Sequence, residues 1–175
     1  MANILNLFKF IESKRKQYHV PLRYKLINNL PVTKDELNVR GSLNLNNTPI
    51  QSLPDNLKVG GNLILNNTPI QSLPNNLKVN RSLNLSRTQI TSLPDDLKVG
   101  WSLLLSHTLS QSLPDNLKVG GLDLSHTPIQ SLPDNLTVRN GLNLSNTPIS
   151  KKYTKEQIIK MIEEKGGSVK GIYIF

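Results

Sequence analysis

A 20-residue repeat constrains this sequence more than any other feature. The dipeptide Leu-Pro recurs with successive spacings of 20, 20, 20 and 19 residues. Within the regular array it begins at five positions: Leu53, Leu73, Leu93, Leu113 and Leu132. Complete units start at Val39, Val59, Val79, Val99 and Val119, and a truncated unit starts at Val138. A short, fixed period of this kind predicts a solenoid, in which each repeat forms one coil that stacks on the preceding coil.

The pattern within one unit predicts a short strand followed by two turns. Leu63 and Leu65 alternate with other residues, so we expect both leucines to point into the coil and Ile64 to point outward. Asn-Asn-Thr-Pro then breaks the strand, and Leu-Pro-Asp-Asn turns the chain on the far side. A single coil buries too few aliphatic side chains to offset the entropy of ordering its backbone, so only a stack of coils is stable.

The two ends of such a stack would expose leucine and valine, so capping segments are required. Residues 1–38 form the predicted N-terminal cap, in which the stretch 20–39 resembles a degenerate coil. The first part of this cap carries apolar residues at helical spacing: Ile4, Leu5, Phe8 and Ile11. Thr33-Lys34-Asp35-Glu36 has the spacing of a capping box, which predicts a short helix at that point.

Residues 39–150 form the predicted repeat array, and residues 151–175 form the predicted C-terminal cap. Thr154-Lys155-Glu156-Gln157 has capping-box spacing and predicts the start of a helix that ends at Gly166-Gly167. This helix has one apolar face, formed by Ile158, Ile159 and Ile162. We expect Val169–Phe175 to form a final strand.

The repeat resembles the short bacterial class of leucine-rich repeat. Its pattern is Thr-x-Ile-x-x-Leu-Pro with a later Leu-x-Leu, where that class has Asn-x-Leu-x-x-Leu-Pro and a later Leu-x-Val. The stretch NTPIQSLPDNLKVGG is also similar to arrays in bacterial and bacteriophage proteins. The resemblance implies a right-handed, β-rich solenoid with a parallel sheet and about six coils.

One column departs from that family pattern. The asparagine that bonds neighbouring backbones in the family is threonine in this chain, at Thr48, Thr68, Thr88, Thr108, Thr127 and Thr147. Because a hydroxyl has less reach than an amide, we expect coils that are flatter than those of a curved horseshoe.

Composition excludes several kinds of chemistry. The chain of 175 residues has no cysteine, which removes disulfides, thiolate zinc sites, iron–sulfur clusters and thiol nucleophiles. It therefore lacks the cysteine-dependent ubiquitin-ligase activity that accompanies such repeats in some bacterial effectors. The sequence contains no phosphate-binding loop, no Gly-x-Gly-x-x-Gly before a helix and no His-x-x-x-His pair. We therefore expect a non-enzymatic protein with no cofactor.

Hydropathy predicts the cellular environment. No run approaches the 18 apolar residues of a membrane span, and the N-terminus lacks the apolar core and cleavage site of a signal peptide. We expect a soluble cytoplasmic protein with no membrane partner, which would lie in the host cytoplasm if a bacteriophage encodes it.

The best indication of a functional surface is the set of positions at which the repeat fails. Outward strand and rim positions are mostly Asn, Ser or Gly, and most of the exceptions lie in the third to fifth coils. The exceptions are Ile64, Arg81, Arg87, Trp101, Leu104, His107, Asp123 and His126. We predict that all of these except Ile64 form a contact patch for a partner protein.

Trp101 has two interpretations. It is the only tryptophan, and a tryptophan flanked by arginine and histidine is typical of a binding hot spot. Alternatively, it covers a packing defect, because Ser110 stands where every other full coil has isoleucine.

The histidines offer a second hypothesis. His107 and His126 occupy the same position in adjacent coils, about 5 Å apart, and Asp123 lies nearby. Two histidines and a carboxylate can hold a metal ion. The simpler interpretation is that both histidines replace asparagine in a polar turn, and we predict no metal site.

Charge offers a third hypothesis. The chain has 21 Lys and Arg residues against 12 Asp and Glu residues, for a formal net charge of +9, and most of the excess lies in the caps. Bases such as Lys14, Arg15, Lys16, Lys151 and Lys152 favour a nucleic acid or another anionic ligand. A column of Lys58, Lys78, Lys98 and Lys118 follows Asp55, Asp95 and Asp115 by three residues. We expect this column to be a solvated turn with locally compensated charge.

The leading hypothesis is a protein-recognition module that binds through the strand face and rim of the solenoid. If the bacteriophage resemblance holds, the partner is a bacterial host protein, such as one that acts in antiviral defence. The alternatives are nucleic-acid or anion binding through the basic caps, and a structural element whose terminal strand pairs with a neighbour.

Overall fold

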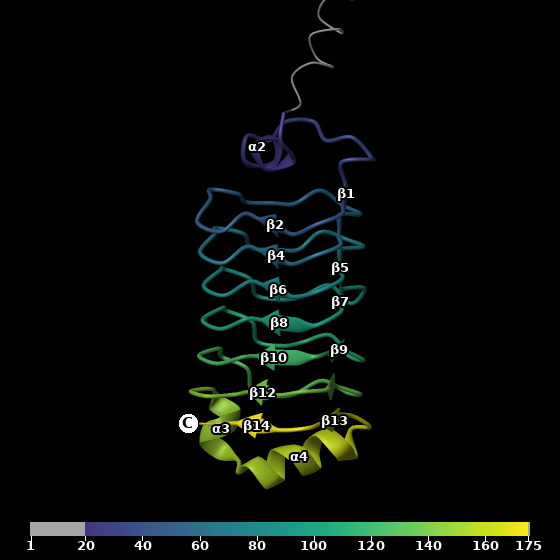
Figure 1. Ribbon diagram of the computed structural model, residues 1–175. Coiled ribbons are helices and arrows are strands. Elements are labelled where there is room, and N and C mark those ends of the chain that lie inside the picture. The colour runs from purple at the N-terminus through teal and green to yellow at the C-terminus, as the bar shows by residue number, and fades with distance from the viewer. Residues whose placement is uncertain (1–19, 175) are drawn as a thin grey trace, which may run out of the picture.

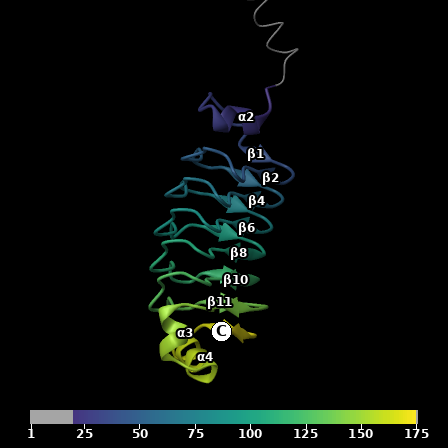
Figure 2. The same ribbon diagram turned by 90° about the vertical axis from the view of Figure 1, so that its left-hand side faces the viewer.

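The computed structural model describes residues 20–174 and shows one column of stacked coils (Figure 1). The view turned by 90° shows the same nearly straight stack, with helical segments at both ends (Figure 2). The parallel β-solenoid with end caps that the repeat predicts is therefore confirmed.

One parallel sheet runs the length of the column, and we call it the front sheet. Its strands lie in the order β14-β12-β10-β8-β6-β4-β2, so each coil contributes one strand. They are β2 (Leu43–Asn44), β4 (Leu63–Ile64), β6 (Leu83–Asn84), β8 (Ser102–Leu104), β10 (Gly121–Asp123), β12 (Leu142–Asn143) and β14 (Ile172–Tyr173). Leu63 and Leu65 are fully buried and Ile64 is half-buried, which confirms the predicted alternation.

A second row of short strands lies on another side of the column, and the sequence analysis did not predict it. A four-stranded parallel sheet and a three-stranded parallel sheet make up this row, and we call them the side sheets. The first contains β1 (Asn38–Val39), β3 (Lys58–Val59), β5 (Lys78–Val79) and β7 (Lys98–Val99). The second contains β9 (Lys118–Val119), β11 (Thr137–Val138) and β13 (Ser168–Val169). Two residues are too few to show an alternating pattern in a sequence.

The core is a stack of aliphatic side chains, with one set from each coil. The coil that starts at Val59 buries six of them: Val59, Leu63, Leu65, Ile70, Leu73 and Leu77. The same positions in the next coils are buried to a similar degree. Each coil therefore covers the apolar faces of its two neighbours, which is why an isolated coil has no stable core.

The six threonines of the repeat column bond within their own coils. Each hydroxyl donates to the carbonyl oxygen of the leucine three residues earlier, at 2.6–2.8 Å. The side chains are 0–7% exposed, so each bond satisfies a carbonyl that is shielded from water. This arrangement differs from the family ladder, in which an amide connects neighbouring coils.

The N-terminal cap contains a helix that the sequence analysis did not predict, α2 (Leu22–Ile27). The predicted helix around Ile4–Ile11 lies outside the described residues. The predicted capping box forms, because the Thr33 N–H donates to Glu36 Oε2 at 2.9 Å and the Glu36 N–H donates to Thr33 Oγ1 at 3.4 Å. The segment is nevertheless only a hydrogen-bonded turn and not a helix, since the chain enters β1 at Asn38. That prediction was wrong.

An ion pair connects α2 to this turn. Lys25 Nζ lies 2.7 Å from Glu36 Oε1, and the two side chains are 19% and 18% exposed. The hydrogen bond from the Lys25 ammonium, followed by the bond from the Thr33 N–H, holds the pKa of Glu36 below its usual value of 4.5. The cap is therefore more stable when Glu36 is ionised.

We expect Glu36→Gln to destabilise the cap at pH 7 and to have little effect in acid. Because folding lowers the pKa of Glu36, its ion pair contributes stability above about pH 4.5, the pKa of the unfolded chain. That contribution is lost as the pH falls through the lower pKa of the folded state. Hydrogen exchange of the α2 amides, compared between wild type and variant from pH 7 to pH 3, measures the difference. A difference that does not change with pH would contradict the assignment.

The C-terminal cap contains α3 (Pro148–Lys152) and α4 (Lys155–Glu164). Thr154 and Gln157 form the predicted capping box, and Ile158 and Ile162 are buried beneath the last coil. The expected single strand from Val169 is instead two strands, because the chain turns a corner between β13 and β14 and completes a further coil. Within residues 20–174, no helix has both the length and the apolar character that crossing a membrane requires.

Candidate functional site

The predicted patch occupies the middle of the front sheet and its two rims. Leu104 on β8 and Asp123 on β10 lie opposite each other in register, and both are half-buried. Arg81 and Trp101 lie just before β6 and β8, at one rim. Arg87, His107 and His126 lie just after β6, β8 and β10, at the other rim. The structure thus places the seven residues on three adjacent coils.

Arg81 and Trp101 form the best-defined pair on this surface. The Arg81 guanidinium carbon lies 5.4 Å from the centroid of the Trp101 ring. The backbone N–H of Trp101 donates to the backbone carbonyl of Arg81 at 3.1 Å. Trp101 is 61% exposed. A guanidinium that stacks on an indole restricts the motion of both side chains while leaving apolar area open to solvent. This ordering reduces the entropy that binding would cost.

The opposite rim is a column of left-handed turn residues. Each coil places one residue there with φ between 53° and 59°. The column contains Asn47, Asn67, Arg87, His107, His126 and Asn146. Asparagine tolerates this conformation well, whereas arginine gains nothing from it, so the turn itself does not explain Arg87.

The two histidines stack on each other in this column. Their ring centroids lie 4.3 Å apart with an interplanar angle of 23°, and His126 Nε2 lies 3.4 Å from Asn146 Nδ2. Asn47 and Asn67 make an equivalent contact between neighbouring coils, at 3.1 Å. Stacked rings extend a side-chain ladder along the rim, which agrees with the interpretation that the histidines replace asparagines.

Asp123 does not complete a metal site with these histidines. Its Oδ1 accepts the Ser125 N–H at 3.0 Å. Asn84 and Asn143 make the same bond to the residue two positions later, so Asp123 has a local role in shaping the turn. In the part of the chain that the structure describes, no group of three His, Asp or Glu side chains is arranged to hold a metal ion.

Trp101 and Ser110 lie in different environments. Ser110 is fully buried and its hydroxyl lies 3.3 Å from the Ser112 carbonyl oxygen, whereas Trp101 is mostly exposed. Trp101 therefore does not fill the space that Ser110 leaves in the core. The hot-spot interpretation of Trp101 is the one that its exposure favours.

We expect Ser110→Ile to raise the free energy of unfolding by about 2 kcal/mol, since burying an isoleucine side chain contributes about 1.5–3 kcal/mol. The equivalent residues Ile90 and Ile129 are fully buried in the coils on either side. Urea unfolding followed by circular dichroism measures the change. Ser106→Ile, at a half-buried rim position, is the control and should give no comparable gain. A loss of stability in Ser110→Ile would show that this coil has closed around the serine.

The lysine column is exposed to solvent, as expected, and Asp95, Asp96 and Asp115 lie beside it. Lys58, Lys78, Lys98 and Lys118 are all exposed, and none has an ion-pair partner among residues 20–174. The acidic residues before them bond to backbone instead. Asp55 accepts the Asn75 N–H at 3.0 Å, and Asp115 accepts the Asp134 N–H at 2.9 Å.

A break separates the two side sheets between β7 and β9. The Lys98 N–H donates to the Leu77 carbonyl of the preceding coil, but no equivalent bond connects Lys118 to Leu97 in the described structure. The Gly120 N–H donates to the Trp101 carbonyl, whereas the equivalent Gly100 N–H donates to the Val79 carbonyl. The break precedes the shortened repeat, across which β8 pairs with β10 and β9 pairs with β11.

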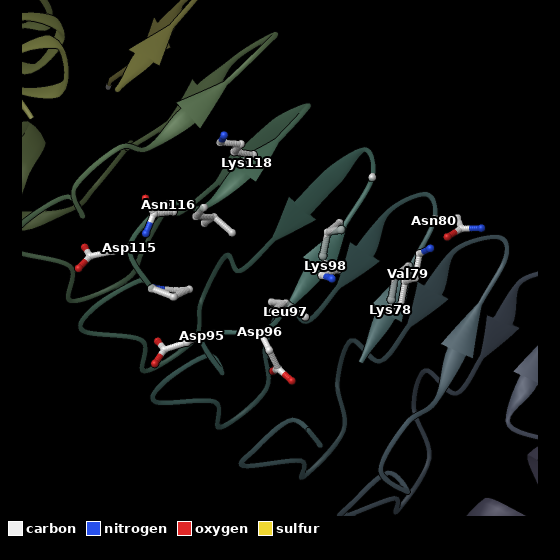
Figure 3. Close-up of a pocket in the computed structure, with 14 residues that line it drawn as sticks. Lys78, Val79, Asn80, Asp95, Asp96, Leu97, Lys98, Asp115, Asn116 and Lys118 are labelled. Carbon is white, nitrogen blue, oxygen red and sulfur yellow. The ribbon is translucent and has the colours of Figure 1, made fainter. Parts of the chain in front are cut away.

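A cavity of about 420 Å³ lies at this break on the side face. Lys78, Lys98 and Lys118 lie on successive strands beside it, and Asp95, Asp96 and Asp115 lie on the preceding turns (Figure 3). The sequence gives no signal of the break, because the Leu-Pro spacing is still 20 residues there and falls to 19 only between Leu113 and Leu132.

The basic residues of the C-terminal cap line a shallow pocket, to which Lys151, Lys152 and Lys155 contribute together with Glu156. Lys14, Arg15 and Lys16 lie outside the described residues. Lys151 and Lys152 are exposed at the end of α3, and the Lys152 ammonium lies 5.1 Å from the Tyr153 ring centroid. α4 packs beneath β13 and β14, so a helix covers this end of the stack.

Comparison with protein families, curated proteins and solved structures finds no match to this chain. The functional assignment therefore rests on the geometry of its surfaces.

Proposed function

We propose that this chain is a non-enzymatic recognition module of the leucine-rich repeat type, which binds a partner protein through the middle of the front sheet and its rims. The proposed contact residues are Arg81, Arg87, Trp101, Leu104, His107, Asp123 and His126. A solenoid fold of stacked repeats is consistent with this function, because its regular surface offers a broad, rigid face to a partner.

The exposed Trp101 with its stacked Arg81 is the observation that carries the proposal. Tryptophan and arginine are enriched at the centres of protein interfaces, where one ordered apolar group contributes much of the affinity. The two side chains are already held against each other, so little further ordering is needed on binding. Leu104 adds a half-buried apolar side chain on the adjoining sheet.

A bacterial host protein is the partner that the resemblance to bacteriophage repeats suggests. Immobilised full-length protein would therefore be incubated with nuclease-treated bacterial lysate, and the retained proteins identified by mass spectrometry. The retained protein would then be purified and its affinity measured by isothermal titration calorimetry.

We expect the double variant Arg81→Ala, Trp101→Ala to bind the purified partner at least 30-fold more weakly than wild type, as for a hot spot worth 2 kcal/mol or more. The control is Arg23→Ala, Tyr24→Ala, which removes an exposed arginine and a 56% exposed tyrosine from α2. The control should bind as wild type does. Equal binding by the Arg81, Trp101 variant and wild type would reject the proposed patch.

A further inference from the structure

The four lysines of the side sheets form a straight row of like charges. Lys58 lies opposite Lys78, and Lys78 lies opposite Lys98, in register on parallel strands. Lys118 follows across the break, on β9. Adjacent strands lie about 4.8 Å apart, so the four lysine positions extend over roughly 14 Å.

None of these four lysines forms an ion pair within residues 20–174. Like charges directly opposite each other on neighbouring strands are destabilising, yet the repeat places lysine there four times. The nearby carboxylates accept backbone N–H groups, as Asp96 does from Asn76 at 2.7 Å. These acids stabilise the turns, and no lysine of the row is held in an ion pair in the described part of the chain, so its ammonium group is free to contact a ligand.

Further cations extend the row at both ends. Arg40, Arg139 and Lys170 each follow a strand of the side sheets by one residue, and all three are exposed. Each follows by two residues the position that lysine occupies in the other coils, which is Asn38, Thr137 or Ser168 in these coils. Cations therefore occur along the length of the side face, and Asp95, Asp96 and Asp115 lie beside them on the preceding turns.

We propose that this row binds a linear chain of phosphate groups, as found in single-stranded nucleic acid or inorganic polyphosphate. A ligand that runs along the row lies across the strands. The backbone N–H and C=O groups within each side sheet already bond to neighbouring strands, so they cannot bond to this ligand. Its affinity must therefore come from charge alone. A phosphate polymer carries a charge on every unit, whereas an extended acidic peptide presents only alternate side chains to one face.

Lysine suits this form of binding. An ammonium group on a flexible four-carbon stem acts as a point charge that adjusts to each phosphate without requiring a fixed geometry. This surface is separate from the Arg81–Trp101 pair, so the phosphate site and the proposed protein-binding patch can be tested independently.

Fluorescence anisotropy with a labelled 15-nucleotide oligothymidylate and the full chain tests the proposal. If four phosphates are neutralised, the wild-type affinity should fall about 50-fold between 50 mM and 200 mM salt. The variant with Lys58, Lys78, Lys98 and Lys118 all changed to Gln should lose at least tenfold in affinity at 50 mM salt. It should also show a much smaller dependence on salt.

The matched control changes four exposed basic residues elsewhere to Gln: Arg23, Lys34, Lys155 and Lys160. It removes the same charge, and we expect its affinity to stay within about threefold of wild type. Equal losses in both variants would overturn the proposal, because binding would then follow total charge. Failure of wild type to bind oligothymidylate and polyphosphate would also overturn it.

Two further measurements complete the test. Thermal unfolding should show the variant with all four lysines changed to Gln to be at least as stable as wild type, because like charges no longer lie opposite each other. A loss of binding in this variant could then not be attributed to misfolding. Competition by polyphosphate and by unlabelled oligothymidylate identifies which phosphate source binds more tightly. Polyglutamate that competes as well as either phosphate polymer would overturn the phosphate assignment in favour of an acidic protein.

Discussion

Replacing Leu85 with alanine will lower the free energy of unfolding by about 3–5 kcal/mol. Leu85 is fully buried, and Leu65 and Leu105 occupy the same position in the coils above and below it. Truncation removes the transfer free energy of the lost methyl groups and leaves a cavity that a close-packed stack cannot close. The loss is large because Leu85 contributes to two coil–coil contacts at once.

Urea unfolding followed by circular dichroism measures this effect, with Leu109→Ala as the control. Leu109 is 55% exposed, so its truncation should change stability by less than about 0.5 kcal/mol. A small effect at Leu85 would contradict the assignment of this column to the core. A large effect at Leu109 would show that its rim is covered.

Placing a charge under the C-terminal cap will have an equally large effect. Ile158 of α4 is fully buried against the last coil, together with Ile162 and Ile172. Ile158→Asp loses the apolar contact and brings a carboxylate into a site without a partner, which we expect to cost about 5 kcal/mol. The helix then detaches, and β13 and β14 lose their cover.

Size-exclusion chromatography and urea unfolding together test this prediction. Exposed strand edges pair with other chains, so Ile158→Asp should self-associate as well as unfold at lower urea. Lys160→Asp, on the exposed face of the same helix, is the control and should remain monodisperse with nearly unchanged stability. A stable, non-associating Ile158→Asp variant would show that α4 is not required as a cap.

Much of the fold follows from local features of the sequence. The 20-residue period specifies the stack, and the alternation of Leu63 and Leu65 specifies the inward face of the front sheet. The capping-box pattern predicted the start of α4 correctly, but at Thr33 it predicted a helix where the structure has only a turn. That turn shows the limit of a local signal. The hydrogen bonds of the capping box form, but no helix follows because the chain enters β1, which pairs with β3 of the next coil.

The sequence predicted the candidate site only as a set of positions at which the residue departs from the repeat. Departures from the repeat identified Arg81 and Trp101, but not that the guanidinium stacks on the indole. They identified His107 and His126, but the same spacing allowed either a metal site or a stacked pair. The contacts between coils decided these points, because residues 19 or 20 positions apart come within contact distance only once the register of the stack is set.

The sequence by itself therefore determined the solenoid, its aliphatic core and its capped C-terminal end, since each depends on a pattern that repeats within one coil. The tertiary structure alone decided the side sheets, the partners of the threonine hydroxyls, the break between β7 and β9, and the unpaired lysine row. These features depend on how each coil meets the next, and the pattern within one repeat does not specify those contacts. Even across the shortened fifth repeat, β8 pairs with β10 and β9 pairs with β11 in register.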